Sequence, residues 1–144
     1  MTTVRQLLGG KGHSVYTIGP DATVYEALQE MAARDVGALV VTEQGEVVGI
    51  VSERDYARKL ALTGKISRET PVRAIMSDQV DCVGSQQTLD GCMALMSQKR
   101  VRHLPVLENG QLAGIISIGD VVNAIIEGQQ STIEELEHYI TGRR

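Results

Sequence analysis

Apolar residues recur at helical spacing in two stretches of the chain. These positions are Val24, Ala27, Leu28 and Met31 in the first stretch, and Leu89, Cys92, Met93 and Met96 in the second. Spacings of three and four residues place the apolar side chains on one face of a helix. Thr23 stands before the first stretch and has the spacing of a capping box with Glu26, which predicts where the helix begins. The second stretch has Gly91 in place of Glu26, so we expect its helix to be capped more weakly.

Each of these helices is followed by two apolar runs that a short turn separates. The runs are residues 38–41 and 47–51 with Gln44-Gly45 between them, and residues 104–107 and 112–116 with Asn109-Gly110 between them. Asn-Gly between apolar runs is the strongest short signal for a hairpin, so we expect two β-hairpins. Strand-like stretches at 15–18 and 80–83 precede the helices, and a further helix is expected after Ser52 and after Ser117.

The two halves are copies of each other. A shift of 65 residues places Val15 to Asp55 on Val80 to Asp120 without a gap, and the best match joins residues 49–55 to residues 114–120. A repeat of fixed period predicts two copies of one supersecondary unit, and half-size units need each other to bury their apolar faces. The element order therefore predicts an α+β fold in which two β-α-β-β-α units pack with pseudo-two-fold symmetry.

The repeat divides the chain into three parts. Residues 1–64 hold an N-terminal segment and the first unit, residues 65–128 a linker helix and the second unit, and residues 129–144 a C-terminal helix. In the linker, Thr70-Pro71 is expected to open a short helical turn through Val72, Ile75 and Met76. The C-terminal part carries Ile133, Leu136 and Ile140 on one narrow helical face. That face could cap the core or dock on a second subunit, and the pattern leaves both open.

The composition of the chain excludes some classes of binding partner. The net charge is −4, and the chain has no Trp, no Phe and four Tyr, which leaves neither a basic field nor an aromatic platform for bases. Nucleic-acid binding is therefore not expected. No apolar signal-type segment follows Met1, and no stretch approaches the length that spans a bilayer, so we expect no membrane insertion and a cytoplasmic protein.

Cysteine and histidine give no sign of a metal or redox site. Cys82 and Cys92 have the spacing of neither a redox pair nor a metal clip, and they are expected to be small buried thiols. His13, His103 and His138 fall in three different elements, so no metal site is expected.

A short motif closes each unit. Ser52 with Asp55, and again Ser117 with Asp120, form Ser-x-x-Asp just after a strand that contains Gly. In a single copy this pattern is most often only a helix cap. Two copies in register favour a role in nucleotide binding. A carboxylate in the first turn of a helix can accept hydrogen bonds from both hydroxyls of a ribose, while free backbone donors face a phosphate.

These features together resemble a tandem cystathionine-β-synthase (CBS) domain pair, also called a Bateman module. The resemblance rests on the doubled unit, the two Ser-x-x-Asp ends and the run at residues 102–106, and it covers nearly the whole chain. The runs at 52–56, 70–72 and 136–140 resemble the stand-alone bacterial members, which carry no attached enzyme or channel.

The resemblance implies two clefts between the units, each taking a ribose-binding Asp from one unit and base-contacting strands from the other. Carried over, cleft 1 contains Ile50, Ser52, Arg54, Asp55, Met76, Val80, Asp81, Val101, Arg102 and His103. Cleft 2 contains Lys11, Val15, Tyr16, Val36, Gly37, Ala38, Ile115, Ser117 and Asp120. The implied effector contains adenosine, and AMP, ADP, ATP and NAD all fit this description. No catalytic cofactor is implied.

The differences between the copies make the clefts unequal. Arg102-His103 replaces Gly37-Ala38, and Arg54 replaces Gly119, so cleft 1 gathers positive donors. Arg holds phosphate through paired donors, and His can add a charge near neutral pH. We therefore expect phosphorylated ligands to prefer cleft 1. The alternative is that Arg102 and His103 are a solvated strand end. Cleft 2 is expected to accept a bulkier ligand or to bind more weakly.

The sequence thus predicts a non-enzymatic adenine-nucleotide sensor that acts in signal transduction. It shows no nucleophile paired with a base, no Walker-type loop and no metal-ligand cluster, so an enzyme is not expected. A homodimer and a separate, unidentified protein target are expected. The alternative is a ligand-independent scaffold for dimerisation, in which the Ser-x-x-Asp elements only cap helices.

Overall fold

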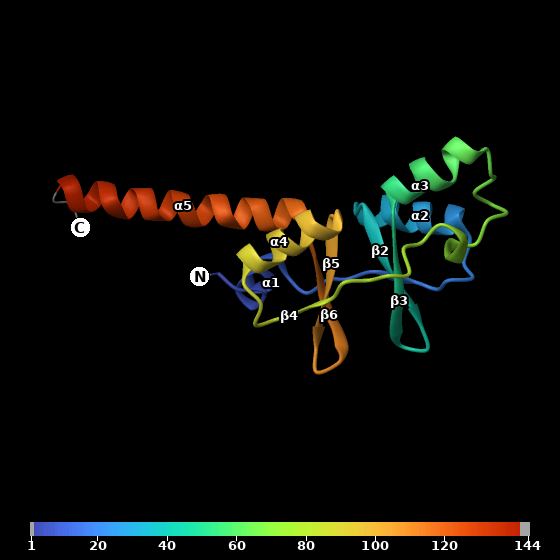
Figure 1. Cartoon of the computed structure of the whole chain (residues 1–144), viewed down its shortest axis with the longest axis horizontal. Coiled ribbons are helices and arrows are strands. Elements are labelled where there is room, and N and C mark those ends of the chain that lie inside the picture. The colour runs from blue at the N-terminus through green and yellow to red at the C-terminus, as the bar shows by residue number, and fades with distance from the viewer. Residues whose placement is uncertain (1, 142–144) are drawn as a thin grey trace.

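A computed structural model describes residues 2–141. The first unit runs through β1 (Thr17–Ile18), α2 (Val24–Arg34), β2 (Ala38–Glu43), β3 (Glu46–Ser52) and α3 (Glu53–Lys59). The second unit runs through β4 (Val83–Gly84), α4 (Leu89–Lys99), β5 (His103–Glu108), β6 (Gln111–Ser117) and α5 (Ile118–Thr141). This order confirms the α+β fold and the doubled β-α-β-β-α unit. The two hairpins lie side by side, with the helices toward the other end of the strands (Figure 1).

Each unit has its own three-stranded mixed sheet, in the orders β1-β2-β3 and β4-β5-β6. The first strand of each sheet is parallel to the second, and the hairpin pair is antiparallel. Ala38 pairs with Ser52 in the first hairpin, as His103 pairs with Ser117 in the second. The first strands are shorter than the pattern indicated, because only two residues of each reach the ladder.

The repeat extends to unusual backbone conformations. Asp35 and Arg100 end α2 and α4 in the left-handed region, with φ of 54° and 56°. Gln44 and Asn109 open the hairpin turns with φ of 53° each. Because left-handed φ is disfavoured for residues with a Cβ, its recurrence at equivalent positions shows that both copies fold by the same local rules.

The helix starts agree with the caps that the sequence predicts, with one difference. The Thr88 hydroxyl accepts from the Gly91 amide and caps α4. The Thr23 hydroxyl accepts from the Glu26 amide at 3.1 Å and caps α2. Thr23 and Glu26 thus make the same single bond as Thr88 and Gly91, and the stronger cap expected for α2 does not appear among the described hydrogen bonds.

The segment in front of each unit packs in the core of the other unit. Helix α1 (Val4–Lys11) buries Val4, Leu7 and Leu8 in the cluster of the second unit. The short 3-10 helix η2 (Val72–Ala74), which follows the linker, contributes Val72 to the cluster of the first unit, and Ile75 joins it there. A second 3-10 turn, η1 (Ala61–Thr63), follows α3. Each core is therefore completed by a segment that lies in front of the other unit, which explains why one copy is not enough.

Two equivalent glycines receive these incoming segments. A Cβ at Gly49 would lie 2.7 Å from Met76 Sδ and 2.9 Å from the Ser77 carbonyl oxygen. A Cβ at Gly114 would meet only the tip of Leu8, at 3.1 Å. Glycine at these positions lets the inserted segment approach the hairpin closely.

The last helix is longer than the pattern indicated. The helix expected after Ser117 and the C-terminal helix expected from residue 129 are one continuous helix, α5, of 24 residues. It leaves the body of the molecule on the side away from the first unit (Figure 1). Residues 142–144, which end the expected C-terminal part, lie outside the described residues.

Candidate functional site

Both Ser-x-x-Asp elements form complete caps. The Ser52 hydroxyl accepts from the Asp55 amide at 3.2 Å, and Asp55 Oδ2 accepts from the Ser52 amide at 3.0 Å. The Asp120 amide donates to the Ser117 hydroxyl at 3.1 Å, and the Ser117 amide donates to Asp120 Oδ2 at 2.8 Å. The structural interpretation of the motif therefore holds in both copies. It leaves the second carboxylate oxygen of each Asp available for another partner.

The remaining partner of Asp55 comes from its own helix. Lys59 Nζ lies 3.1 Å from Asp55 Oδ1, one helical turn away, and also donates to the Ile75 carbonyl at 3.1 Å. The Lys59 side chain is 48% exposed, whereas that of Asp55 is 18% exposed. An exposed ammonium on the same helix can leave this carboxylate by a local change of rotamer.

The partner of Asp120 comes from a distant part of the chain. Lys11 Nζ, at the end of α1, lies 2.7 Å from Asp120 Oδ2 and also donates to the Ile115 carbonyl. Burial raises the pKa of Asp120, but the Lys11 ammonium and the hydrogen bonds from Ser117 outweigh it and hold that pKa below its ordinary value. Lys11 therefore ties α1 to the start of α5 across the second unit.

A cavity of about 510 Å³ opens beside Asp55. Its lining comes from both units: Gly37, Ile50, Ser52, Glu53, Arg54, Asp55, Arg58 and Lys59 from the first, and Ser77, Gln79, Val80, Asp81, Arg100, Val101, Arg102 and His103 from the linker and the second. Pockets for small ligands and cofactors have volumes of roughly 300–1,000 Å³. The cavity is therefore large enough for a nucleotide.

Arginine side chains from both units gather around this cavity. Arg54, Arg58, Arg100 and Arg102 all line it, from α3 and from the segment before β5. The neighbouring charge of Arg58, desolvation and then the charge of Arg102 lower the pKa of Arg54, although Asp55 opposes this. Like charges that lie close together repel one another unless an anion is bound, so this group of arginines is suited to a phosphate.

His103 contributes differently from the sequence-based expectation. It is half-buried at the start of β5, where it lines the cavity beside Asp55 and also feels the charges of Lys11 and Asp120. Burial is the largest influence, and with the Lys11 and Arg102 charges it lowers the pKa of His103 below 6.5. The direction of this shift disfavours the positive charge that the sequence analysis considered for His103.

Most residues assigned to cleft 1 line this one cavity. Met76 instead packs against the core of the first unit, next to Gly49. Gly37, which was assigned to cleft 2, lines the cavity beside Asp55, and its carbonyl accepts from the Glu53 amide at the start of α3.

The residues assigned to cleft 2 fall into two groups. Lys11, Ile115, Ser117 and Asp120 form the hydrogen-bonded cluster described above. Tyr16 and Val36 pack against the core of the first unit, Ala38 is buried at the start of β2, and Val15 is half-buried. A hollow of about 590 Å³ touches Lys11 and Asp120, but its other walls come from α1, α5 and Thr2. It therefore lies between α1 and α5, without a contribution from the first unit.

The cavity also contains basic residues that the sequence analysis did not single out. Arg58, Lys59 and Arg100 line it, while their equivalents in the repeat are Asn123, Ala124 and Asp35. The signal was present, since the comparison of copies that identified Arg54 and Arg102 also separates these three positions. Their helical or helix-end placement made them look like ordinary solvated charges.

Two further properties of the described residues bear on the kind of site. Across residues 2–141, no helix is both long enough and apolar enough to cross a membrane. Over the same described side chains, no cluster of three or more His, Cys, Asp and Glu is placed to hold a metal ion.

Comparison with known proteins agrees with this architecture. The family model for the CBS domain matches residues 12–62 and 72–127. A solved structure of a protein with CBS domains from Burkholderia ambifaria MC40-6, described as a candidate signal-transduction protein, has 46% sequence identity and a TM-score of 0.85. The match covers 89% of this chain and 96% of that one.

Curated relatives have the same family assignment. CBS domain-containing protein YhcV of Bacillus subtilis is 32% identical over 86% of this chain and 89% of its own length. CBS domain-containing protein CBSX3 of Arabidopsis thaliana, a mitochondrial protein, is 36% identical over 98% of this chain and 73% of its own length. CBS-domain proteins of this kind are generally regulatory rather than catalytic. The two matched segments coincide with the two structural units, and the chain belongs to the CBS domain family as a tandem CBS pair.

Proposed function

We propose that this CBS pair is a non-enzymatic sensor of adenine nucleotides, and that a phosphorylated ligand prefers the cavity beside Asp55. The single observation that carries the proposal is the joining, in one cavity of about 510 Å³, of the Asp55 carboxylate with Arg54, Arg58 and Arg102. CBS domains typically bind adenosine ligands. A carboxylate for ribose hydroxyls and a guanidinium cluster for phosphate match the two polar ends of such a ligand.

The binding mode follows from the local geometry. Asp55 Oδ2 is held by the Ser52 cap, so Oδ1 accepts a ribose hydroxyl when Lys59 moves away. The phosphates then lie against Arg54, Arg58 and Arg102, where an added negative charge relieves the repulsion among the guanidinium groups. The apolar walls formed by Ile50, Val80 and Val101 receive the adenine ring.

The ligand bridges the two units, and this gives a route to a signal. The lining comes from both units, so bound nucleotide favours the arrangement in which Asp55 faces Arg102. A signal requires that the ligand bind this arrangement more tightly than an alternative one. We propose that the chain acts as a homodimer that passes this change to a separate protein, as CBS proteins often oligomerise.

A thermal-shift panel of AMP, ADP, ATP, NAD and S-adenosylmethionine tests the proposal. A ligand that binds the native state raises its apparent stability by mass action, so at least one adenosine ligand raises the Tm. Asp55→Asn keeps a side chain that can cap α3 but removes the negative charge, and it should reduce the shift without lowering the Tm of the free protein greatly. A panel without any shift would support the ligand-independent scaffold instead.

A further inference from the structure

A heptad pattern runs along one face of α5. Its members alternate in spacings of four and three residues, as positions a and d of a coiled coil do. We call them the α5 seam: Val122, Ile126, Gln129, Ile133, Leu136 and Ile140. Gln129 is the one polar member, and the apolar members are 36–79% exposed. Large apolar side chains that cluster on a surface in this way mark an interaction site.

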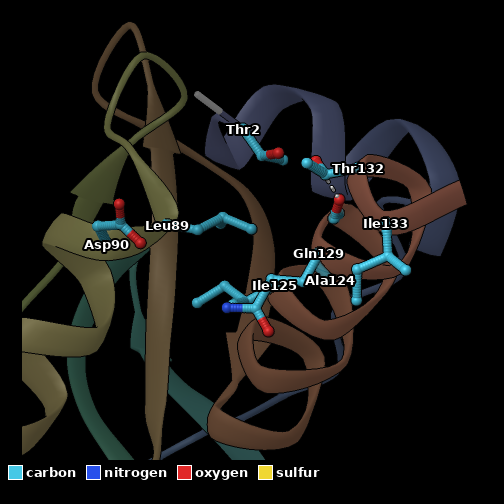
Figure 2. Close-up of a pocket in the computed structure, with 9 residues that line it drawn as sticks. Thr2, Leu89, Asp90, Ala124, Ile125, Gln129, Thr132 and Ile133 are labelled. Atoms are coloured by element: carbon cyan, nitrogen blue, oxygen red, sulfur yellow. Dashed lines mark hydrogen bonds between the residues drawn. The ribbon is translucent and has the colours of Figure 1, made fainter. Parts of the chain in front are cut away.

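A groove lies beside the seam where α5 leaves the second unit. It has a volume of about 640 Å³, and Gln129 and Ile133 of the seam line it together with Leu89 at the start of α4. Figure 2 shows Leu89 and Ile125 pointing into the space between the two helices. Beyond this groove, residues 134–141 continue the helix away from the second unit (Figure 1), so the seam is open to another molecule there.

The charge of α5 differs from that of the rest of the chain. The helix holds five of the 18 acidic residues and none of the 14 Lys and Arg residues, so the remainder is not acidic. Three of the five lie around the end of the seam, namely Glu134, Glu135 and Glu137. Asp90 of α4 adds a carboxylate to the lining of the groove. Two such helices side by side would bring like charges together, whereas a helix rich in Lys and Arg would bring opposite charges together.

From the seam and its charge we infer that α5 is the docking site for the separate target protein, and that the target presents a basic amphipathic helix. The two helices form a short coiled coil, in which apolar side chains of the target meet Ile133, Leu136 and Ile140. Isoleucine at position a and leucine at position d favour two strands. The Lys and Arg side chains of the target lie opposite the glutamates, and this pairing selects the target over a second copy of the chain.

The start of α5 lies close to the cavity of the proposed function. Ser117 immediately precedes α5 and pairs with His103 in the ladder of β5 and β6. His103 in turn lines the cavity beside Asp55. The helix that receives the target therefore begins one strand pair from the cavity, which suits it to carry the output of a sensor. The inference rests on the proposed function for the existence of a target, but not on nucleotide binding.

Two synthetic helical peptides test the inference in fluorescence anisotropy titrations with the full-length protein. Both have Ile at position a and Leu at position d, and they differ in having either Lys or Glu on both sides of this apolar face. We expect the basic peptide to bind about tenfold more tightly than the acidic one. Leu136→Ser should weaken binding of the basic peptide about tenfold and keep the fold, because Leu136 is 56% exposed.

Charge variants separate docking from a general attraction between a cationic peptide and an acidic protein. Glu134→Lys combined with Glu137→Lys should weaken binding of the basic peptide about tenfold and improve binding of the acidic one. Glu46→Lys combined with Glu69→Lys makes the same change of net charge at exposed positions of the first hairpin and the linker, and should leave both affinities unchanged. Equal losses in the two double variants, or unaltered binding in Leu136→Ser, would overturn the inference.

Sedimentation of the same proteins distinguishes the target from a second copy. A homodimer that Leu136→Ser dissociates, and with which the basic peptide competes, would assign the seam to a second copy and contradict the inference. Tm shifts with the adenosine ligands are measured on the wild type and on Leu136→Ser. Peptide binding without any nucleotide shift would keep the docking site and remove the nucleotide proposal, and a nucleotide shift without peptide binding would do the opposite.

Discussion

Asp55 and Asp120 stand at equivalent positions of the repeat and make the same cap, yet their surroundings differ. Asp55 is paired with Lys59 from its own helix and faces a cavity with four arginines. Asp120 is paired with Lys11 from α1, which also holds the Ile115 carbonyl. A cation on the same helix can yield to a ligand locally, whereas displacement of Lys11 breaks a link between distant elements. The same motif therefore stands beside an arginine-lined cavity in one copy and within a link between two distant elements in the other.

The largest effect should come from the glycines that receive the inserted segments. Gly49→Ala forces a Cβ against the Ser77 carbonyl and Met76, and should destabilise the protein by about 2–3 kcal/mol. Gly114→Ala meets only the flexible tip of Leu8 and should cost less than about 1 kcal/mol. Urea unfolding of both variants measures the difference. Equal losses of unfolding free energy would show that a Cβ is accommodated equally well at Gly49 and at Gly114.

The group of arginines around the cavity provides the next comparison. Arg102→Gln removes a guanidinium from the cavity beside Asp55, and its affinity for ATP should fall about tenfold, or about 1.4 kcal/mol. Its affinity for adenosine should stay unchanged, because adenosine carries no phosphate. Isothermal titration calorimetry measures both, with Arg5→Gln on α1 as the matched control. An equal loss of affinity for both ligands would instead show that Arg102 has a structural role and does not bind phosphate. That result would agree with the alternative in which Arg102 belongs to a solvated strand end.

The two lysines should differ in their contribution to stability. The side chains of Lys11 and Asp120 are 31% and 27% exposed, so Lys11→Met should lower the free energy of unfolding by about 1 kcal/mol. Lys59 is more exposed, and Lys59→Met should cost about 0.3 kcal/mol. Thermal unfolding at pH 7 gives both values. The account of Lys11 as a tie between elements would be lost if Lys59→Met were the more harmful change.

Lys11 also governs an acid-dependent part of the stability. The pKa of Asp120 in the folded state lies below its ordinary value of 3.8, so its contribution is complete above that pH and is lost as the pH falls through the folded value. Lys11→Met should therefore flatten the acid limb of the stability curve.

His103 should produce the smallest effect. Its pKa in the folded state lies below 6.5, so between these two values the unfolded chain binds more protons than the folded protein. The contribution of His103 to the stability therefore rises with pH through this window and is constant above it. The facing charges are those of Lys11, Arg102, Asp120 and Asp55. His103→Gln should reduce the rise, and urea unfolding between pH 5 and 8 measures it; an unchanged curve would assign the rise to other groups.

The sequence was informative wherever the determinant is local. Helical spacing, the Asn109-Gly110 turn and the Ser-x-x-Asp caps each depend on residues close in the chain, and the structure contains the elements that they predict. The repeat added long-range information, because equivalent residues are expected to occupy equivalent places in the two copies of the fold. This is why the doubled unit could be predicted with its two hairpins, although the parallel pairing of the first strand of each sheet was not predicted.

What the sequence could not give depends on where segments pack. Nothing in the local pattern shows that α1 enters the core of the second unit, because its partners there lie far away in the chain. Only the family resemblance placed Lys11 and Asp120 in one cleft, and it did not indicate their ion pair. The same holds for His103, whose pKa is lowered by burial and by the charges of Lys11 and Arg102. Arg58 and Arg100 were hidden for another reason: in sequence they resemble the solvated charges that end most helices.

Calorimetric titration of ATP into the wild type, Asp55→Asn and Asp120→Asn tests the central claim, the inequality of the two clefts, most directly. The account predicts that the tighter binding event is lost or weakened about tenfold in Asp55→Asn and is retained in Asp120→Asn. Loss of the tighter event in Asp120→Asn with its retention in Asp55→Asn, or the same affinity in all three proteins, would contradict it.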